Sequence, residues 1–171
     1  MIAAERQAGT AQAAAARQAA RLAAVQTLYQ MELTGKDAET AAREFLAHGF
    51  ASEREIAPSG KPDEAFFAAI VRGVPHHQVE IDRSIAGCLS EDWKLDRIDS
   101  ILRAILRAGA FELIGRKDVP AKVVIDQYVD VAHAFFSAQE PAFVNAALDR
   151  LARQKRSREF GEAPSGGELE F

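Results

Sequence analysis

Apolar residues recur at helical spacing along most of the chain, and alternating strand-like patterns are nearly absent. The first strong pattern lies between Ala13 and Leu33, and Gly35, a typical residue at a helix end, follows it. At roughly 100° per residue, one face of this segment carries the apolar side chains: Leu22, Val25, Leu28, Tyr29 and Leu33. The pattern predicts an amphipathic helix and indicates an all-α protein.

Further segments show the same spacing, and we expect helices over about residues 37–48, 63–89, 95–114, 120–135 and 141–158. Pro75 lies inside one of them, so a kink or break is expected after Gly73–Val74, because proline lacks a backbone N–H. The 95–114 segment is apolar around much of its circumference, which is typical of a central helix packed on several sides. Residues 52–62, with two prolines and a glycine, are expected to form a loop.

These elements predict one helical domain over residues 13–158, made of two halves (about 13–89 and 91–158) that meet near residue 90. Residues 1–12 are rich in alanine and glutamine, have little to bury, and are expected to be disordered. Residues 159–171 hold four acidic residues and no basic one, and are expected to form a disordered acidic tail.

Composition narrows the function. The 171 residues carry a net charge of −4, so the chain is not a general polyanion binder, and any nucleic-acid site must be a local patch. Cys88 is the one cysteine, which excludes an internal disulfide and fits a reducing compartment. No apolar run reaches the ~18 residues of a membrane span, and the N-terminus lacks the features of a signal peptide. We expect a cytoplasmic protein.

The residues give no support for catalysis. No cysteine or carboxylate stands at a metal-ligand spacing beside the histidines, and no glycine-rich phosphate loop follows a strand. No serine lies in a nucleophile-elbow context. We therefore expect neither an enzyme nor a site for a metal or cofactor.

Arg17 and Arg21 are the strongest candidates for binding. They lie one turn apart on one edge of the first helix's apolar stripe. A cationic pair in this place can meet a polyanion without being buried itself. A solvated first turn is the simpler alternative.

Three residues on later helices resist a purely structural explanation. Glu112 lies inside an apolar face, where a carboxylate needs a cation, backbone donors or a binding partner. Phe143 lies at the margin of the last helix's core stripe, where it is either half-buried or exposed for stacking. Asn145, on the other margin, is either simply exposed or able to contact a base edge or backbone.

Other conspicuous residues favour structural roles. The basic residues near the end of the last helix complement the helix dipole: Arg150, Arg153, Lys155, Arg156 and Arg158. Trp93 is expected to fill the core or a hinge, and Cys88 to be a small core residue.

From about Arg17 to Leu151 the chain resembles the NusB family of bacterial transcription antitermination proteins. Five blocks in order, at compatible spacing, carry this resemblance. They are Arg17-x-x-x-Arg21 leading into Ala24–Tyr29, Trp93, Ile105–Leu113, Asp118–Val123 and Phe143–Asp149.

The resemblance implies an all-helical fold of two three-helix-type halves without enzymatic activity. It further implies binding of single-stranded boxA RNA in ribosomal RNA leader transcripts. The family does this together with NusE, a small-subunit ribosomal protein, within an antitermination complex on RNA polymerase. By position, the resemblance assigns Arg17 and Arg21 to an RNA-binding motif, Lys122 and Asn145 to further RNA contacts, and Tyr29, Glu112 and Phe143 to a shared RNA and NusE face.

Well-known family members carry several adjacent arginines where this chain has only Arg17 and Arg21. Fewer cations release fewer counterions, so we expect weaker and less salt-sensitive RNA binding, and greater reliance on NusE. Two alternatives stay open: a helical adaptor that binds protein only, and a stand-alone relative of the front domain of ribosomal-RNA cytosine methyltransferases. The sequence is compatible with a monomer or a homodimer.

Overall fold

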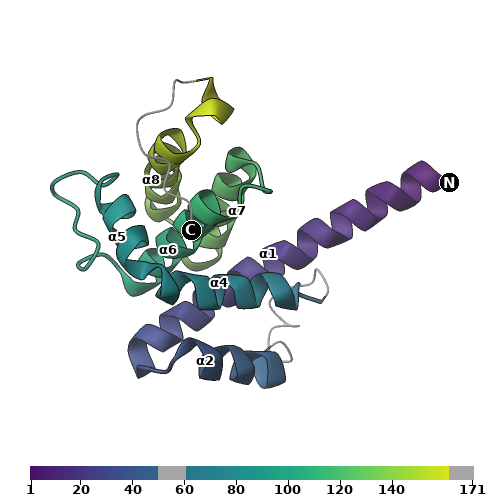
Figure 1. Cartoon of the computed structure of the whole chain (residues 1–171), viewed down its shortest axis with the longest axis horizontal. Helices are drawn as coiled ribbons and strands as arrows, with labels where there is room; N and C mark the ends of the chain where they lie inside the picture. The colour runs from purple at the N-terminus through teal and green to yellow at the C-terminus, as the bar shows by residue number, and fades with distance from the viewer. Residues whose placement is uncertain (50–60, 162–171) are drawn as a thin grey trace. The chain divides into compact units, whose positions relative to one another are not determined.

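The computed structural model describes residues 1–49 and 61–161, and every regular element within these ranges is helical (Figure 1). This confirms the prediction of an all-α protein. The predicted loop over residues 52–62 lies almost wholly outside the described residues. The elements are α1 (Ile2–Thr34), α2 (Ala38–Glu44), the π-helix η1 (Phe45–Gly49), α4 (Glu64–His76), α5 (Gln78–Ala86), α6 (Ser100–Gly115), α7 (Ala121–Phe135), α8 (Glu140–Lys155) and the 3-10 helix η3 (Ser157–Phe160).

The chain forms two compact units, residues 1–72 and 73–171, so the predicted boundary near residue 90 is wrong. Helix α5 belongs to the second unit because its side chains are tied to later helices. Asp82 of α5 accepts two hydrogen bonds from Arg107 of α6, at 2.8 and 2.9 Å. Just after α5, the carbonyl of Cys88 accepts a hydrogen bond from Arg150 of α8 at 3.3 Å.

The break expected after Gly73–Val74 falls instead at His77. Helix α4 continues through Pro75 to His76, and α5 begins at Gln78. Proline removes its own backbone donor, but the amide of His77 still bonds to the carbonyl of Gly73 at 3.0 Å. Helix α4 therefore includes Pro75 and ends one residue after it.

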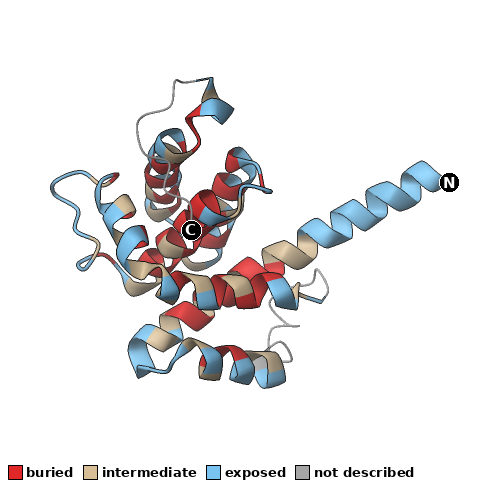
Figure 2. Cartoon of the chain, in the orientation of Figure 1, coloured by how far each residue is buried: buried red, intermediate tan, exposed pale blue. Residues whose placement is uncertain are grey.

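Helix α1 begins at Ile2, so the predicted start near Ala13 is wrong. Residues 2–14 form exposed helical turns, where the sequence predicted a disordered extension (Figure 2). Alanine, glutamine and arginine are strong helix formers, so the helix extends without tertiary contacts. Its end is as expected, since Gly35 adopts the left-handed conformation at φ 72°. Leu33, which was expected on the buried face, is 63% exposed.

In unit 1, a helix cap, an aromatic stack and a backbone hydrogen bond connect neighbouring segments of the chain. The side chain of Asp37 caps α2 by accepting a bond from the amide of Thr40 at 2.9 Å, and this bond lowers the pKa of Asp37. Phe45 stacks on Phe67 with ring centroids 4.9 Å apart. The amide of Asp63 donates to the carbonyl of Ala16 at 3.0 Å, which places the start of α4 beside α1.

Unit 2 is organised around α6, which packs against α5, α7 and α8. Almost every residue of α6 from Leu102 onward is buried, as the sequence predicted for a central helix. The helix starts at Ser100, later than the predicted residue 95, because the Asp99 side chain caps it. Its carboxylate accepts from the amides of Ile101 and Leu102 at 2.8 and 3.3 Å.

Gly109 lets α6 and α8 approach closely. A Cβ atom at this position would lie 2.8 Å from Cδ1 of the buried Leu148. We expect Gly109→Ala to cost about 1–3 kcal/mol of overpacking, partly offset by about 1 kcal/mol of helix propensity. Urea unfolding measures the net loss. Gly87→Ala is the matched control, since a Cβ atom added at Gly87 would lie 3.6 Å from its nearest neighbour, the carbonyl oxygen of Ser84. Equal stability of the two variants would contradict the close packing of α6 against α8 at Gly109.

Arg156 was expected, with the other basic residues near the end of α8, to complement the dipole of that helix, but its side chain acts mainly on α6 and the turn that follows it. Its side chain is buried, and its guanidinium donates to four backbone carbonyls. Nε bonds to Leu113 at 2.8 Å, Nη2 to Glu112 at 2.9 Å and Arg116 at 2.8 Å, and Nη1 to Val119. One side chain thus caps the C-terminal end of α6 and holds the α6–α7 turn.

We expect Arg156→Met to lower the free energy of unfolding by about 2–6 kcal/mol. The carbonyls of Glu112 and Arg116 keep bonds from the amides of Arg116 and Val119, whereas those of Leu113 and Val119 lose the Arg156 donor. Each buried carbonyl left without a donor costs about 1–3 kcal/mol. Chemical denaturation followed by circular dichroism checks this. Arg158→Met removes an exposed arginine two residues away and serves as the control. Similar midpoints for the two variants would show that the capping contributes little.

The predicted disordered tail is wrong for its first residues. Glu159 lies in η3, and its carboxylate accepts a bond from the amide of Ala121 at 2.9 Å, at the start of α7. It also pairs with Arg156 at 3.3 Å. Residues 162–171 of the predicted tail lie outside the described residues.

In the part of the chain that the structure describes, no helix is both long and apolar enough to cross a membrane.

Candidate functional site

The two candidate arginines of unit 1 share one aromatic ring. The guanidinium carbons of Arg17 and Arg21 each lie 4.9 Å from the ring centroid of Phe66 in α4. Arg17 is partly exposed, whereas Arg21 is only 2% exposed. The prediction that the pair avoids burial is therefore wrong for Arg21, because the sequence gives no sign that Phe66 packs onto this edge of α1.

The contact with Phe66 has a simple electrostatic basis. The face of an aromatic ring is negative, so it attracts a guanidinium, and the attraction grows where water is excluded. The ring therefore places both cations on one side of α1 and leaves part of Arg17 in contact with solvent. Tyr29, the third candidate in unit 1, is also partly exposed on the same helix.

Glu112 was predicted to lie on a face shared by RNA and NusE, but its side chain is fully buried in α6. A carboxylate without solvent exposure cannot contact a partner unless the helix moves. This favours the structural alternative, an internal carboxylate.

We expect Glu112→Lys to destabilise unit 2, because it puts an ammonium group where a buried carboxylate is accommodated. Thermal unfolding should show a clearly lower midpoint. Glu80→Lys, an equal charge reversal at an exposed position of α5, should leave the midpoint nearly unchanged. If the Glu112→Lys protein keeps its native stability but specifically loses partner binding, Glu112 belongs to the partner interface and the structural role is wrong.

Lys122 and Asn145 are both exposed. Lys122 lies in the first turn of α7, and Asn145 lies in α8, two residues from Phe143. Their exposure fits the expected contact with RNA and equally fits simple solvation.

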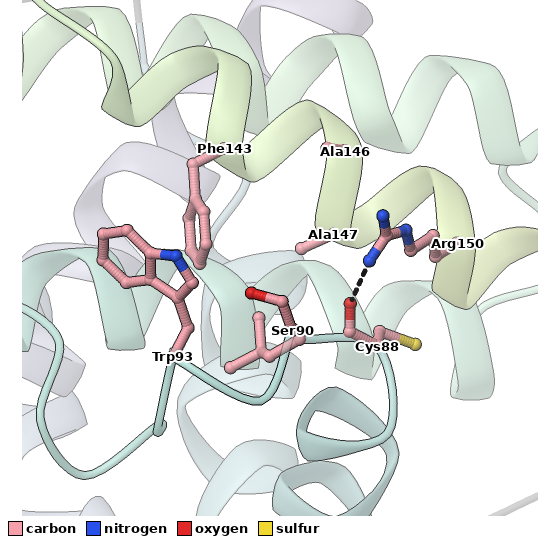
Figure 3. Close-up of a pocket in the computed structure, with 8 residues that line it drawn as sticks. Cys88, Ser90, Trp93, Phe143, Ala146, Ala147 and Arg150 are labelled. Atoms are coloured by element: carbon pink, nitrogen blue, oxygen red, sulfur yellow. Dashed lines mark hydrogen bonds between the residues drawn. The ribbon is translucent and has the colours of Figure 1, made fainter.

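Phe143 lies beside Trp93 at a pocket in unit 2 (Figure 3). The two ring centroids are 5.1 Å apart with the planes tilted by 44°. Trp93 is 51% exposed, so its expected role as a plug of the core or a hinge is wrong. The pocket has a volume of about 150 Å³ and is lined by Cys88, Leu89, Ser90, Trp93, Phe143, Ala146, Ala147 and Arg150.

Sequence reasoning missed Arg150 as part of this pocket, although a signal was present. Phe143, Ala146, Ala147 and Arg150 stand at positions i, i+3, i+4 and i+7 of α8, so they share one helix face.

Cys88 at the edge of the pocket is buried, and burial raises the pKa of its thiol, against the smaller opposing effects of Lys155 and Arg150. The thiol is therefore protonated at neutral pH. Among the described residues, no group of three or more histidine, cysteine or acidic side chains is arranged to hold a metal ion.

The model of the NusB family matches residues 18–153 of this chain. The chain belongs to the NusB family. It is 51% identical over 144 residues to the transcription antitermination protein NusB of Maricaulis maris, and the match covers 84% of this chain and 90% of that protein. It is 49% identical over 140 residues to the NusB of Caulobacter vibrioides, covering 82% of this chain and 94% of that protein.

A solved structure of NusB from T. maritima has the same fold. It superimposes with a TM-score of 0.71 at 28% sequence identity, covering 85% of this chain and 96% of that one. The NusB fold predicted from the five sequence blocks is thereby confirmed.

Proposed function

We propose that this protein is an RNA-binding transcription antitermination factor. It binds boxA RNA of ribosomal RNA transcripts together with NusE, within an antitermination complex on RNA polymerase in the cytoplasm. The observation that carries this proposal is the match to NusB antitermination proteins, which reaches 51% identity over 144 residues. The arginines on Phe66 and the exposed groups of α7 and α8 supply chemistry suited to a single-stranded RNA.

In this proposal Arg17 contacts a phosphate, because its guanidinium is held by Phe66 and still reaches solvent. Arg21 supports the same patch from a buried position and adds to the local positive potential. Lys122 supplies a further phosphate contact from α7, and the amide of Asn145 can donate to or accept from a base edge. This small set of cations predicts a modest dependence of RNA affinity on salt.

NusE is proposed to contact the partly exposed aromatic side chain of Tyr29, since aromatic anchors commonly dominate protein interfaces. Phe143, also partly exposed, is proposed to belong to the face that RNA and NusE share. Glu112 has no part in this contact, because it is buried. In this proposal RNA and NusE bind together with positive coupling, so each raises the affinity of the other by the same factor.

The proposal is tested by measuring the affinity for boxA RNA with and without NusE, over a series of salt concentrations. We expect Arg17→Ala to weaken RNA binding about tenfold, as for the loss of one charge-assisted contact, and to reduce the salt dependence. Arg83→Ala, which removes an exposed arginine of α5, is the matched control and should bind as the parent does.

Three results would contradict the proposal. Equal affinity for boxA and a scrambled RNA would remove sequence recognition. NusE binding without any RNA binding would favour a protein-only adaptor. Unchanged RNA binding by Arg17→Ala would remove the patch on α1 from the interface.

A further inference from the structure

The pocket beside Trp93 combines an aromatic wall at one end with a cation at the other (Figure 3). Trp93 and Phe143 form the wall, and Trp93 is half exposed although it is a large apolar side chain. Exposing an indole to water is unfavourable, so a ligand that covers it gains free energy.

Arg150 lies at the other end of the same pocket and has donors to spare. Its Nη1 donates to the carbonyl of Cys88 at 3.3 Å, which fixes the guanidinium beside the pocket. A guanidinium carries five N–H donors, and this bond uses one of them. The residue itself is exposed, so an anionic group can approach it from solvent.

We propose that this pocket receives one unpaired base of a single-stranded RNA, stacked on Trp93 and Phe143, with an adjacent phosphate bound by Arg150. The inference rests on the proposed RNA-binding function and adds a base-binding subsite to it. The small side chains of Ala146 and Ala147 leave room for a planar ring between the aromatic wall and the arginine. The hydroxyl of Ser90 also lines the pocket and can bond to a base edge.

An RNA base fits this arrangement better than an apolar side chain of a protein. A hydrophobic side chain would cover the aromatic wall but would leave Arg150 without an anionic partner. A nucleotide satisfies both ends, since it joins a planar ring to a phosphate.

The charges around the pocket determine whether the base or the phosphate contributes more to the binding of the nucleotide. Glu91 and Asp92 are exposed in the turn before Trp93, and Lys94 follows it. Together with Arg150, these exposed groups carry no net charge, so the pocket region has no strong long-range attraction for phosphate. The subsite therefore binds mainly by stacking, and its contribution depends little on salt.

Trp93 reports directly on the pocket, because it is the one tryptophan of the chain. The full chain is titrated with boxA RNA, and separately with hexauridylate, while tryptophan emission is recorded. We expect quenching in both titrations, since a base stacked on indole alters its emission. By anisotropy of labelled RNA, Trp93→Ala should weaken binding about tenfold or more, and Trp93→Phe should retain most of the affinity.

Arg150→Gln should weaken binding severalfold and leave quenching at saturation intact, since the stack remains. Arg83→Gln in α5 is the matched control and should have no effect. Circular dichroism of each variant establishes that it is folded. If Trp93→Ala does not fold, Trp93→Phe, Arg150→Gln and the emission of the parent chain carry the test.

The outcomes separate this inference from the proposed function. Binding of boxA RNA with unchanged Trp93 emission and unchanged affinity of the Arg150→Gln variant overturns the subsite and leaves the function standing. If hexauridylate quenches Trp93 and binds with the same affinity as boxA RNA, the base-binding subsite is supported and the proposed boxA-specific function is overturned. Absence of binding to either RNA overturns both. Quenching by NusE but by neither RNA makes the pocket a protein-docking site and overturns the base-binding proposal.

Discussion

Unit 2 depends on a single buried guanidinium. Arg156 donates to the carbonyls of Glu112, Leu113 and Arg116, and so satisfies the end of α6, where backbone acceptors have no partner within the helix. Its pairing with Glu159 then links this point to the first amide of α7. The ends of α6 and α8 and the start of α7 are thus tied by one side chain. Lys122 follows Ala121 in the first turn of α7, so it stands directly beside this anchor.

The sequence predicted most of the fold because the helical spacing of apolar residues is a local property. Helix ends were less predictable where a single side chain decides them, as Asp99 does for α6. The unit boundary was misplaced because the Asp82–Arg107 pair joins residues 25 positions apart, and such a pairing leaves no local pattern. The contacts of Arg156 and Glu159 with α6 and α7 were missed for the same reason.

The candidate site was predicted in part. Lys122, Asn145, Phe143 and Tyr29 have the exposure that a binding role requires, whereas Glu112 and Arg21 are buried. Helical projection places a residue on an apolar or polar face, but it cannot say what packs there. Phe66 on α4 covers the edge of α1 that carries Arg21. Trp93 was misjudged in the opposite direction, because a tryptophan in a loop gives no periodicity from which to infer burial.

The exposed beginning of α1 has a thermodynamic consequence of its own. Residues 2–14 gain nothing from a hydrophobic core, so their helicity rests on intrinsic propensity and on continuity with the buried part of the helix. Their backbone amides will exchange hydrogen with solvent far faster than those of Ala20 or Val25. Warming should melt this extension gradually, before the cooperative transition of the units, and reduce the ellipticity without exposing apolar surface.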